Sequence, residues 1–191
     1  MSARRERILE AAISVIARHG VRGMRVQEVA AEAEVSVTLL YHYFGSRSGL
    51  LEHALGAVSE HAARYSLDEA AAPGRSARQE LEIRLMAELQ DTTEVETNSR
   101  AWGELRWASV FDESLRPTVA RLTDEWVEDI AGLIARVREE EGHPDPGADT
   151  APAAERLVAL VEGLSGRWLT GAAPLAHLRQ LLSGGIAREL A

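Results

Sequence analysis

The sequence predicts an all-α protein, and three observations support that prediction. Alternation of apolar and polar residues with the strand period of two is missing, whereas apolar residues recur at spacings of three and four. Ala, Leu, Glu and Arg, which favour helices, dominate the composition. Glycine and proline interrupt the pattern repeatedly, which divides the 191 residues into about nine helices.

Four helices are predicted in the N-terminal third, of which the second and third are short and the fourth is longer. They cover residues 4–19, 26–33, 37–44 and about 47–66. Gly20 and Gly45 follow the first and third helices, where glycine favours a helix end. Ser46 is suited to cap the fourth helix.

A predicted loop over residues 68–75 separates these helices from the rest of the chain. Ser76-Ala-Arg-Gln79 has the capping-box pattern and opens a fifth helix that contains Leu81, Leu85 and Leu89. The remaining helices are predicted over about residues 94–111, 115–141, 152–170 and 174–190. Residues 141–151 contain two glycines and two prolines and therefore predict a break.

The overall composition excludes several classes of protein. A content of 46% hydrophobic and 27% charged residues is typical of a globular chain. No apolar run reaches the ~20 residues of a membrane-spanning helix. The chain has no cysteine, which excludes disulfides and thiolate chemistry. The first twenty residues lack the apolar block of a signal peptide, so we expect a cytoplasmic protein.

Charge is distributed unevenly along the chain. Residues 1–60 contain seven arginines and seven acidic residues, so the remainder carries the whole net charge of −9. An acidic protein is a poor match for nucleic acid, but a neutral, arginine-bearing N-terminal third leaves nucleic-acid binding open.

Residues 25–47 fit a helix-turn-helix unit, whose second helix enters the major groove of DNA. At 100° per residue, one face of residues 37–44 carries Val37, Leu40, Tyr41 and Phe44, and the other carries Thr38, Leu39 and His42. Leu40 and Phe44 then anchor the helix while Thr38 and His42 meet base edges. Alternatively, the aromatic residues simply pack in an all-α core.

Residues around this helix are suited to contact the DNA backbone. Ser36 caps the helix, whose free amides attract a phosphate, and Val37 is placed to touch a thymine methyl group. Tyr43 and Arg47 flank the reading face. The complete set of predicted DNA-binding residues is Arg25, Gln27, Ser36, Val37, Thr38, Leu39, Tyr41, His42, Tyr43 and Arg47.

Residues 7–55 resemble the N-terminal domain of TetR-family transcriptional regulators. The resemblance rests on ILEAA, the stop at Gly20, VQEVAAEA, EVS, LLYHYF and the start SR-x-GLL of the fourth helix, in the family's order. It implies residues 1–46 as a DNA-binding domain and residues 47–191 as a helical effector-binding and dimerisation domain. The penultimate helix, LVALVEGLSGRWLTG, resembles the family more weakly.

The sequence departs from the family at three places. Glu34 stands where glycine is usual, and a left-handed conformation there costs on the order of 1 kcal/mol, so we expect a different turn conformation. Met24 and Arg25 replace a Ser or Thr cap, which predicts a poorly capped second helix. Val37-Thr38-Leu39 replaces a run that begins with a basic residue, which predicts altered base reading.

The resemblance implies a homodimer that reads a palindromic operator, with the last two helices of each subunit in a four-helix bundle. The expected interface residues are Leu157, Leu160, Val161, Leu164, Trp168, Leu175, Leu178 and Leu182. Gly163 and Gly166 would permit close helix approach. The alternative is that these faces pack only within the subunit.

The resemblance also implies a pocket for an unknown small-molecule effector, whose binding separates the recognition helices and releases DNA. The expected lining residues are Met86, Leu89, Trp102, Arg106, Phe111, Trp126 and Trp168. Arg106 would pair with a carboxylate, whereas the acidic surface favours a cationic effector. Each tryptophan has core packing as its alternative role.

No pattern of residues predicts an enzyme, a cofactor or a metal site. The six histidines lack a metal-ligand spacing, and phosphate-binding loops and nucleophile motifs are missing. The favoured hypothesis is therefore a ligand-responsive repressor. The alternatives are an all-α enzyme or carrier that uses the C-terminal cavity, and a dimerisation module that binds no DNA.

Overall fold

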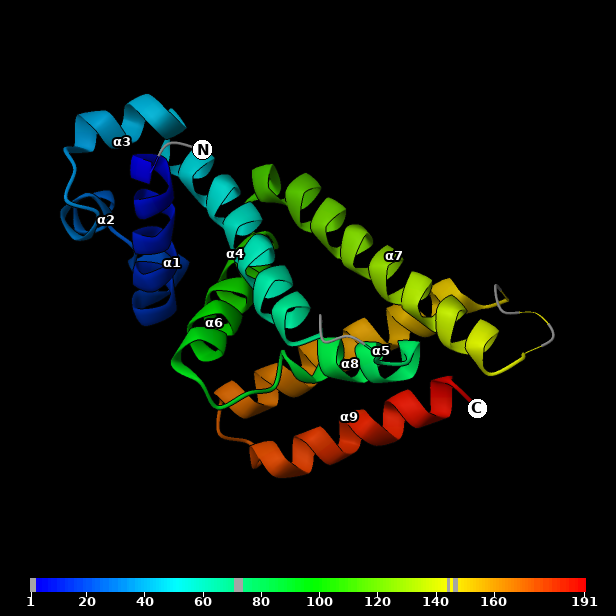
Figure 1. Ribbon diagram of the computed structural model, residues 1–191. Coiled ribbons are helices and arrows are strands. Elements are labelled where there is room, and N and C mark those ends of the chain that lie inside the picture. The colour runs from blue at the N-terminus through cyan, green and yellow to red at the C-terminus, as the bar shows by residue number, and fades with distance from the viewer. Residues whose placement is uncertain (1–2, 71–73, 144, 146–147) are drawn as a thin grey trace. The chain divides into compact units, whose positions relative to one another are not determined.

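The computed structural model describes residues 3–70, 74–143, 145 and 148–191, and within these ranges the protein is all-α (Figure 1). The helices are α1 (Ala3–Gly23), α2 (Val26–Glu32), α3 (Val37–Phe44), α4 (Arg47–Ala70), α5 (Ala77–Met86), α6 (Thr93–Ala108), α7 (Arg116–Glu140), α8 (Thr150–Leu169) and α9 (Leu175–Glu189), with the 3-10 helix η1 (Glu113–Leu115) before α7. The predicted fold class is confirmed.

Serine side chains begin three of the helices as the sequence predicts. Ser36 Oγ accepts a hydrogen bond from the Leu39 amide at 3.1 Å, and Ser46 Oγ accepts one from the Gly49 amide at 3.0 Å. Ser76 and Gln79 form a complete capping box at the start of α5. Each cap satisfies an amide that has no partner within its own helix.

Some predicted boundaries are wrong. Helix α4 continues through Ala70, because Asp68-Glu-Ala70 contains good helix formers, so only part of the expected loop exists there. Residues 71–73 of that loop, and Pro144, Pro146 and Gly147 of the later break, lie outside the described residues. Helix α6 ends at Ala108 rather than near Phe111.

The chain separates by packing into two compact units. Unit 1 comprises Met1–Ala62 and Glu96–Leu122, and unit 2 comprises Ala63–Val95 and Thr123–Ala191. Each unit has its own apolar core. Ile8, Ile16, Leu40, Leu55 and Leu105 are fully buried in unit 1, whereas Leu81, Leu85, Leu89, Leu178 and Leu182 are fully buried in unit 2. The domain boundary after residue 46 stays a prediction.

In the part of the chain that the structure describes, no helix combines the length and the apolar character required to cross a membrane.

Candidate nucleic-acid interface and effector site

Helices α2 and α3 form a helix-turn-helix unit, and its turn carries backbone strain. Glu34 adopts φ 54°, so the expectation of a different turn conformation is wrong: the glutamate takes the left-handed conformation itself. The amide of Val35 donates to the Ala30 carbonyl at 2.9 Å, which closes the C-terminus of α2. The N-cap of α2, Arg25, makes no side-chain cap hydrogen bond, as predicted.

Helix α3 is anchored by one face and presents the other to solvent. Leu40 and Phe44 are buried, with exposed fractions of 0% and 5%. Thr38 and His42 are exposed, as the helix period predicts. Tyr41, which the same arithmetic placed on the core face, is 39% exposed because it lies at the edge of that face. Three neighbouring polar side chains therefore project from α3.

The other predicted DNA-binding residues differ in their exposure. Arg25, Gln27 and Ser36 are exposed, whereas Val37, Leu39 and Tyr43 are partly buried. The Arg47 guanidinium donates a hydrogen bond to the Val21 carbonyl of α1, so this arginine is directed into unit 1 in the structure. Direct contact of these residues with DNA stays a prediction.

An ion pair and a second polar contact join α2 to α1. The Arg18 guanidinium donates to Glu32 Oε2 at 2.5 Å, and His19 Nε2 lies 3.0 Å from Glu28 Oε1. The hydrogen bond from Arg18 lowers the pKa of Glu32 below its usual value. Because both pairs are largely exposed, their contribution is to orientation more than to stability.

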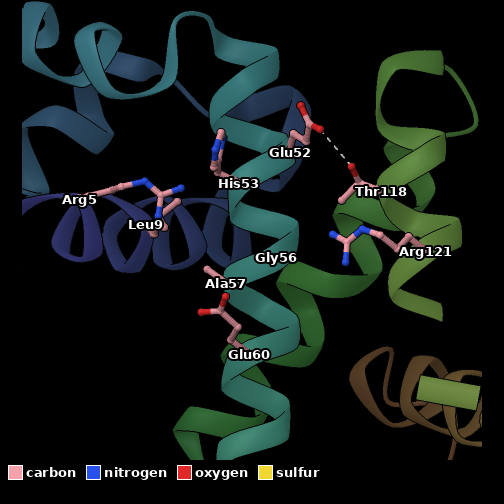
Figure 2. A pocket seen from close by; sticks show the side chains of 9 residues that line it. All are labelled: Arg5, Leu9, Glu52, His53, Gly56, Ala57, Glu60, Thr118 and Arg121. Carbon is pink, nitrogen blue, oxygen red and sulfur yellow. Dashed lines mark hydrogen bonds between the residues drawn. The ribbon is translucent and has the colours of Figure 1, made fainter. Parts of the chain in front are cut away.

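Beside the helix-turn-helix unit, α1, α4 and α7 enclose a pocket of about 250 Å³ within unit 1 (Figure 2). Figure 2 shows Arg5 on one side and Arg121 on the other, with Gly56 and Ala57 of α4 between them. The Thr118 hydroxyl donates to Glu52 Oε1 at 3.2 Å and so joins α7 to α4. The pocket is lined by charged residues of both signs, which distinguishes it from the largely apolar effector site that the sequence predicts.

The predicted effector-pocket residues are divided between the two units. In unit 1, Trp102 packs partly against the core, Arg106 lies over the Trp107 ring at 5.7 Å, and Phe111 is 91% exposed. In unit 2, Leu89 is fully buried in the core, and Met86, Trp126 and Trp168 pack partly against it. That these residues line one pocket stays a prediction.

Met86 also lines a groove of about 440 Å³ within unit 2, together with Glu82, Asp91, Leu175 and Arg179. Arg179 of α9 donates to the Leu89 carbonyl at 2.7 Å and holds the segment after α5.

The same segment contains Glu88, an acidic residue that sequence reasoning missed. Burial raises the pKa of Glu88 to about 7, although the hydroxyl of Tyr65, which donates to Glu88 Oε2 at 2.9 Å, opposes this effect. The residue as a whole is partly exposed, while its carboxyl group is surrounded by protein. The only signal in the sequence is its position between two apolar residues, Ala87 and Leu89.

Most of the expected dimer-interface residues pack inside unit 2. Five of the eight have an exposed fraction of 4% or less: Leu157, Val161, Leu164, Leu178 and Leu182. The burial of these five is therefore explained within one subunit, because α8 and α9 turn their large apolar residues toward their own core. Leu160, Trp168 and Leu175 are partly buried.

Comparison with known proteins decides the family. Residues 8–54 match the family model of bacterial regulatory proteins of the tetR family, and residues 77–191 match that of the C-terminal domain of BetI-type transcriptional repressors. The chain belongs to the TetR family. It is thus a helix-turn-helix transcriptional regulator, and the favoured hypothesis from the sequence is confirmed at this level.

Individual relatives agree with this assignment. The chain is 28% identical over 170 residues to the regulator BetI of Paraburkholderia xenovorans strain LB400, covering 88% of this chain and 82% of that one. A TetR-family regulator from Rhodococcus sp. of known structure is 42% identical, covers 100% of both chains and has a TM-score of 0.91. A regulator from Saccharomonospora viridis, solved in complex with choline, is 26% identical, covers 98% and 97%, and has a TM-score of 0.81.

Proposed function

We propose that this TetR-family regulator is a ligand-responsive repressor that acts in the cytoplasm, where it binds a palindromic DNA operator as a homodimer. The observation that carries the proposal is the division of α3 into a buried face and an exposed face. Its apolar face is buried at Leu40 and Phe44, which leaves Thr38, Tyr41 and His42 exposed on the same helix. A hydroxyl, a phenol and an imidazole on one short helix are suited to hydrogen bonds with base edges in the major groove.

Contacts with the sugar-phosphate backbone would position this helix. Arg25 and Gln27 are exposed in the first turn of α2, and the capped N-terminus of α3 at Ser36 presents backbone amides. Such contacts orient a protein on the duplex without reading its sequence. Arg47 supports the unit from inside through its hydrogen bond to Val21.

The exposed face of α8 and α9 suits a dimer contact better than their buried face. Ala159, Gly163 and Gly166 are exposed on α8, and Gly184 is exposed on α9 beside Leu181, which is 41% exposed. Small residues permit two helices to approach closely, and Leu181 adds an apolar contact. Two subunits joined in this way would present two recognition helices to the two halves of a palindrome.

A cation is the effector that the chemistry of unit 2 favours. Glu88 offers a carboxylate shielded from water, where attraction to a positive charge is stronger than at the surface. The similar regulator from S. viridis was solved with choline, a quaternary ammonium ion. Tyr65 is in hydrogen-bond contact with Glu88 and would orient the carboxylate.

Choline is a direct probe of the effector hypothesis. Its affinity, measured by calorimetry, is expected to rise with pH up to about 7, because a cation favours the ionised form of Glu88. Glu88→Gln is expected to remove this pH dependence, and Glu94→Gln, a change at an exposed carboxylate of α6, is expected to retain it. Equal binding by the wild type and Glu88→Gln at all pH values would refute the role of Glu88.

Selection of duplexes from a random pool tests the proposal as a whole. The purified protein is expected to enrich a palindrome whose half-sites are centred about one helical turn, ~34 Å, apart, at a stated salt concentration. Failure of the folded, dimeric protein to enrich any sequence, with bound small molecules removed, would contradict DNA recognition.

A further inference from the structure

Helix α1 is interrupted at Gly20, three residues before its end. Gly20 has φ 69° and ψ 166°, so the helix stops there and restarts at Val21. The amide of Met24 donates to the Gly20 carbonyl at 3.1 Å, which is the first hydrogen bond of the restarted turn. An interruption of this kind frees the amide of Val21 from the helix that precedes it.

Glu104 of α6 satisfies this freed amide from 83 residues along the chain. The Val21 amide donates to Glu104 Oε2 at 3.1 Å. The same carboxylate lies against Gly20, because a β-carbon added there would be 2.7 Å from Glu104 Oε2. The hydrogen bond and this close approach, both made by Glu104 Oε2, place the end of the Glu104 side chain at the interruption, where it acts as the N-terminal cap of the restarted turn.

The segment that Glu104 caps is also the approach to the DNA-reading helices. The Val21 carbonyl accepts a hydrogen bond from Arg47 at the start of α4, so the backbone is held from two elements of unit 1. Only Met24 and Arg25 separate the end of α1 from the start of α2. A shift at residues 20–21 therefore changes the direction in which α2, and with it α3, begins.

We propose that Glu104 is a positioning residue for DNA recognition: by capping the Val21 amide, it makes the placement of the helix-turn-helix unit depend on the position of α6. This inference rests on the proposed function, since it concerns how that function is controlled. Helix α6 begins at Thr93, in a segment that packs with unit 2, and reaches Glu104 in unit 1.

Three variants test this role, each measured on a duplex recovered by selection. Glu104→Ala is expected to weaken operator binding by about fivefold per subunit, the effect of losing one ordinary hydrogen bond. Glu104→Gln keeps a side-chain acceptor and is expected to bind within about twofold of the wild type, as is the matched control Glu94→Ala in the first turn of the same helix. Circular dichroism checks that every variant is folded.

A second readout follows the contact itself. Hydrogen exchange of the Val21 amide, resolved by NMR, is expected to be faster in Glu104→Ala and close to the wild-type rate in Glu104→Gln. Unchanged exchange together with unchanged or tighter operator binding in Glu104→Ala would overturn the proposal. A wild type that binds no duplex would instead refute the proposed function, and exchange at Val21 would still decide whether Glu104 holds this backbone.

Discussion

Helix α3 and the pair α8–α9 both bury one apolar face, but they differ in the residues that remain exposed. On α3 the exposed positions are polar and aromatic, as Thr38, Tyr41 and His42 show. On α8 and α9 many exposed positions are small, such as Gly163, Gly166 and Gly184. Burial therefore identifies the core in both regions, whereas the chemistry of the exposed face supports the partner proposed for each: base edges for α3 and another helix for α8–α9.

Both regions depend on fully buried leucines, and truncation of one of these side chains is expected to change stability most. Leu40→Ala and Leu178→Ala each remove a fully buried side chain and are expected to lower the free energy of unfolding by about 2–5 kcal/mol. Urea unfolding followed by circular dichroism measures this change. The control Leu67→Ala, at a position that is 46% exposed, is expected to cost no more than about 0.5 kcal/mol. A similar loss for all three variants would mean that Leu40 does not anchor α3.

The next effect is a dependence of stability on pH that comes from Glu88 of unit 2. The pKa of Glu88 is raised from 4.5 to about 7 in the folded protein, so its protonated form is favoured by folding. Its contribution to stability is therefore greatest below about pH 4.5 and is lost as the pH rises through 7, a loss of up to about 3 kcal/mol. Glu88→Gln is expected to flatten this part of the stability curve, measured by thermal unfolding from pH 5 to 8. A curve identical to that of the wild type would show that Glu88 titrates normally.

A smaller change in stability is expected at Glu34, in the turn before α3. Glu34→Gly is expected to stabilise the protein by about 1 kcal/mol, because glycine adopts φ 54° without steric cost. Ala31→Gly, an exposed position within α2, is the matched control and is expected to destabilise by about 1 kcal/mol. Denaturant titration of both variants provides the test, and equal signs for the two changes would contradict the assigned conformation of Glu34.

The sequence predicts the region around α3 more completely than it predicts unit 2. The bounds Val37–Phe44, the cap at Ser36 and the burial of Leu40 all depend on residues within one or two turns, so local rules suffice. The helix period places Tyr41 on the wrong face because this residue lies at the border between buried and exposed positions. Local rules also predict that Glu34 gives the turn a different conformation, which is wrong because the surrounding turn holds this residue in the left-handed conformation.

Residues whose role comes from distant contacts were not predictable. Glu104 meets Val21 across 83 residues, and Glu88 meets Tyr65 across 23 residues. Neither glutamate belongs to a motif, and each resembles an ordinary acidic residue of a helical protein. The apolar stripes of α8 and α9 are visible in the sequence, but periodicity alone does not distinguish packing within a subunit from packing between subunits.

The variants His42→Ala and Thr38→Ala test whether α3 reads the base sequence. Fluorescence anisotropy at two salt concentrations compares their affinities for the selected palindrome and for an unrelated duplex of equal length. Each change is expected to weaken binding to the palindrome by roughly tenfold per half-site and to relax the base preference there, while affinity for the unrelated duplex is unchanged. An unchanged ratio of specific to nonspecific affinity in both folded variants would show that these side chains of α3 do not read bases.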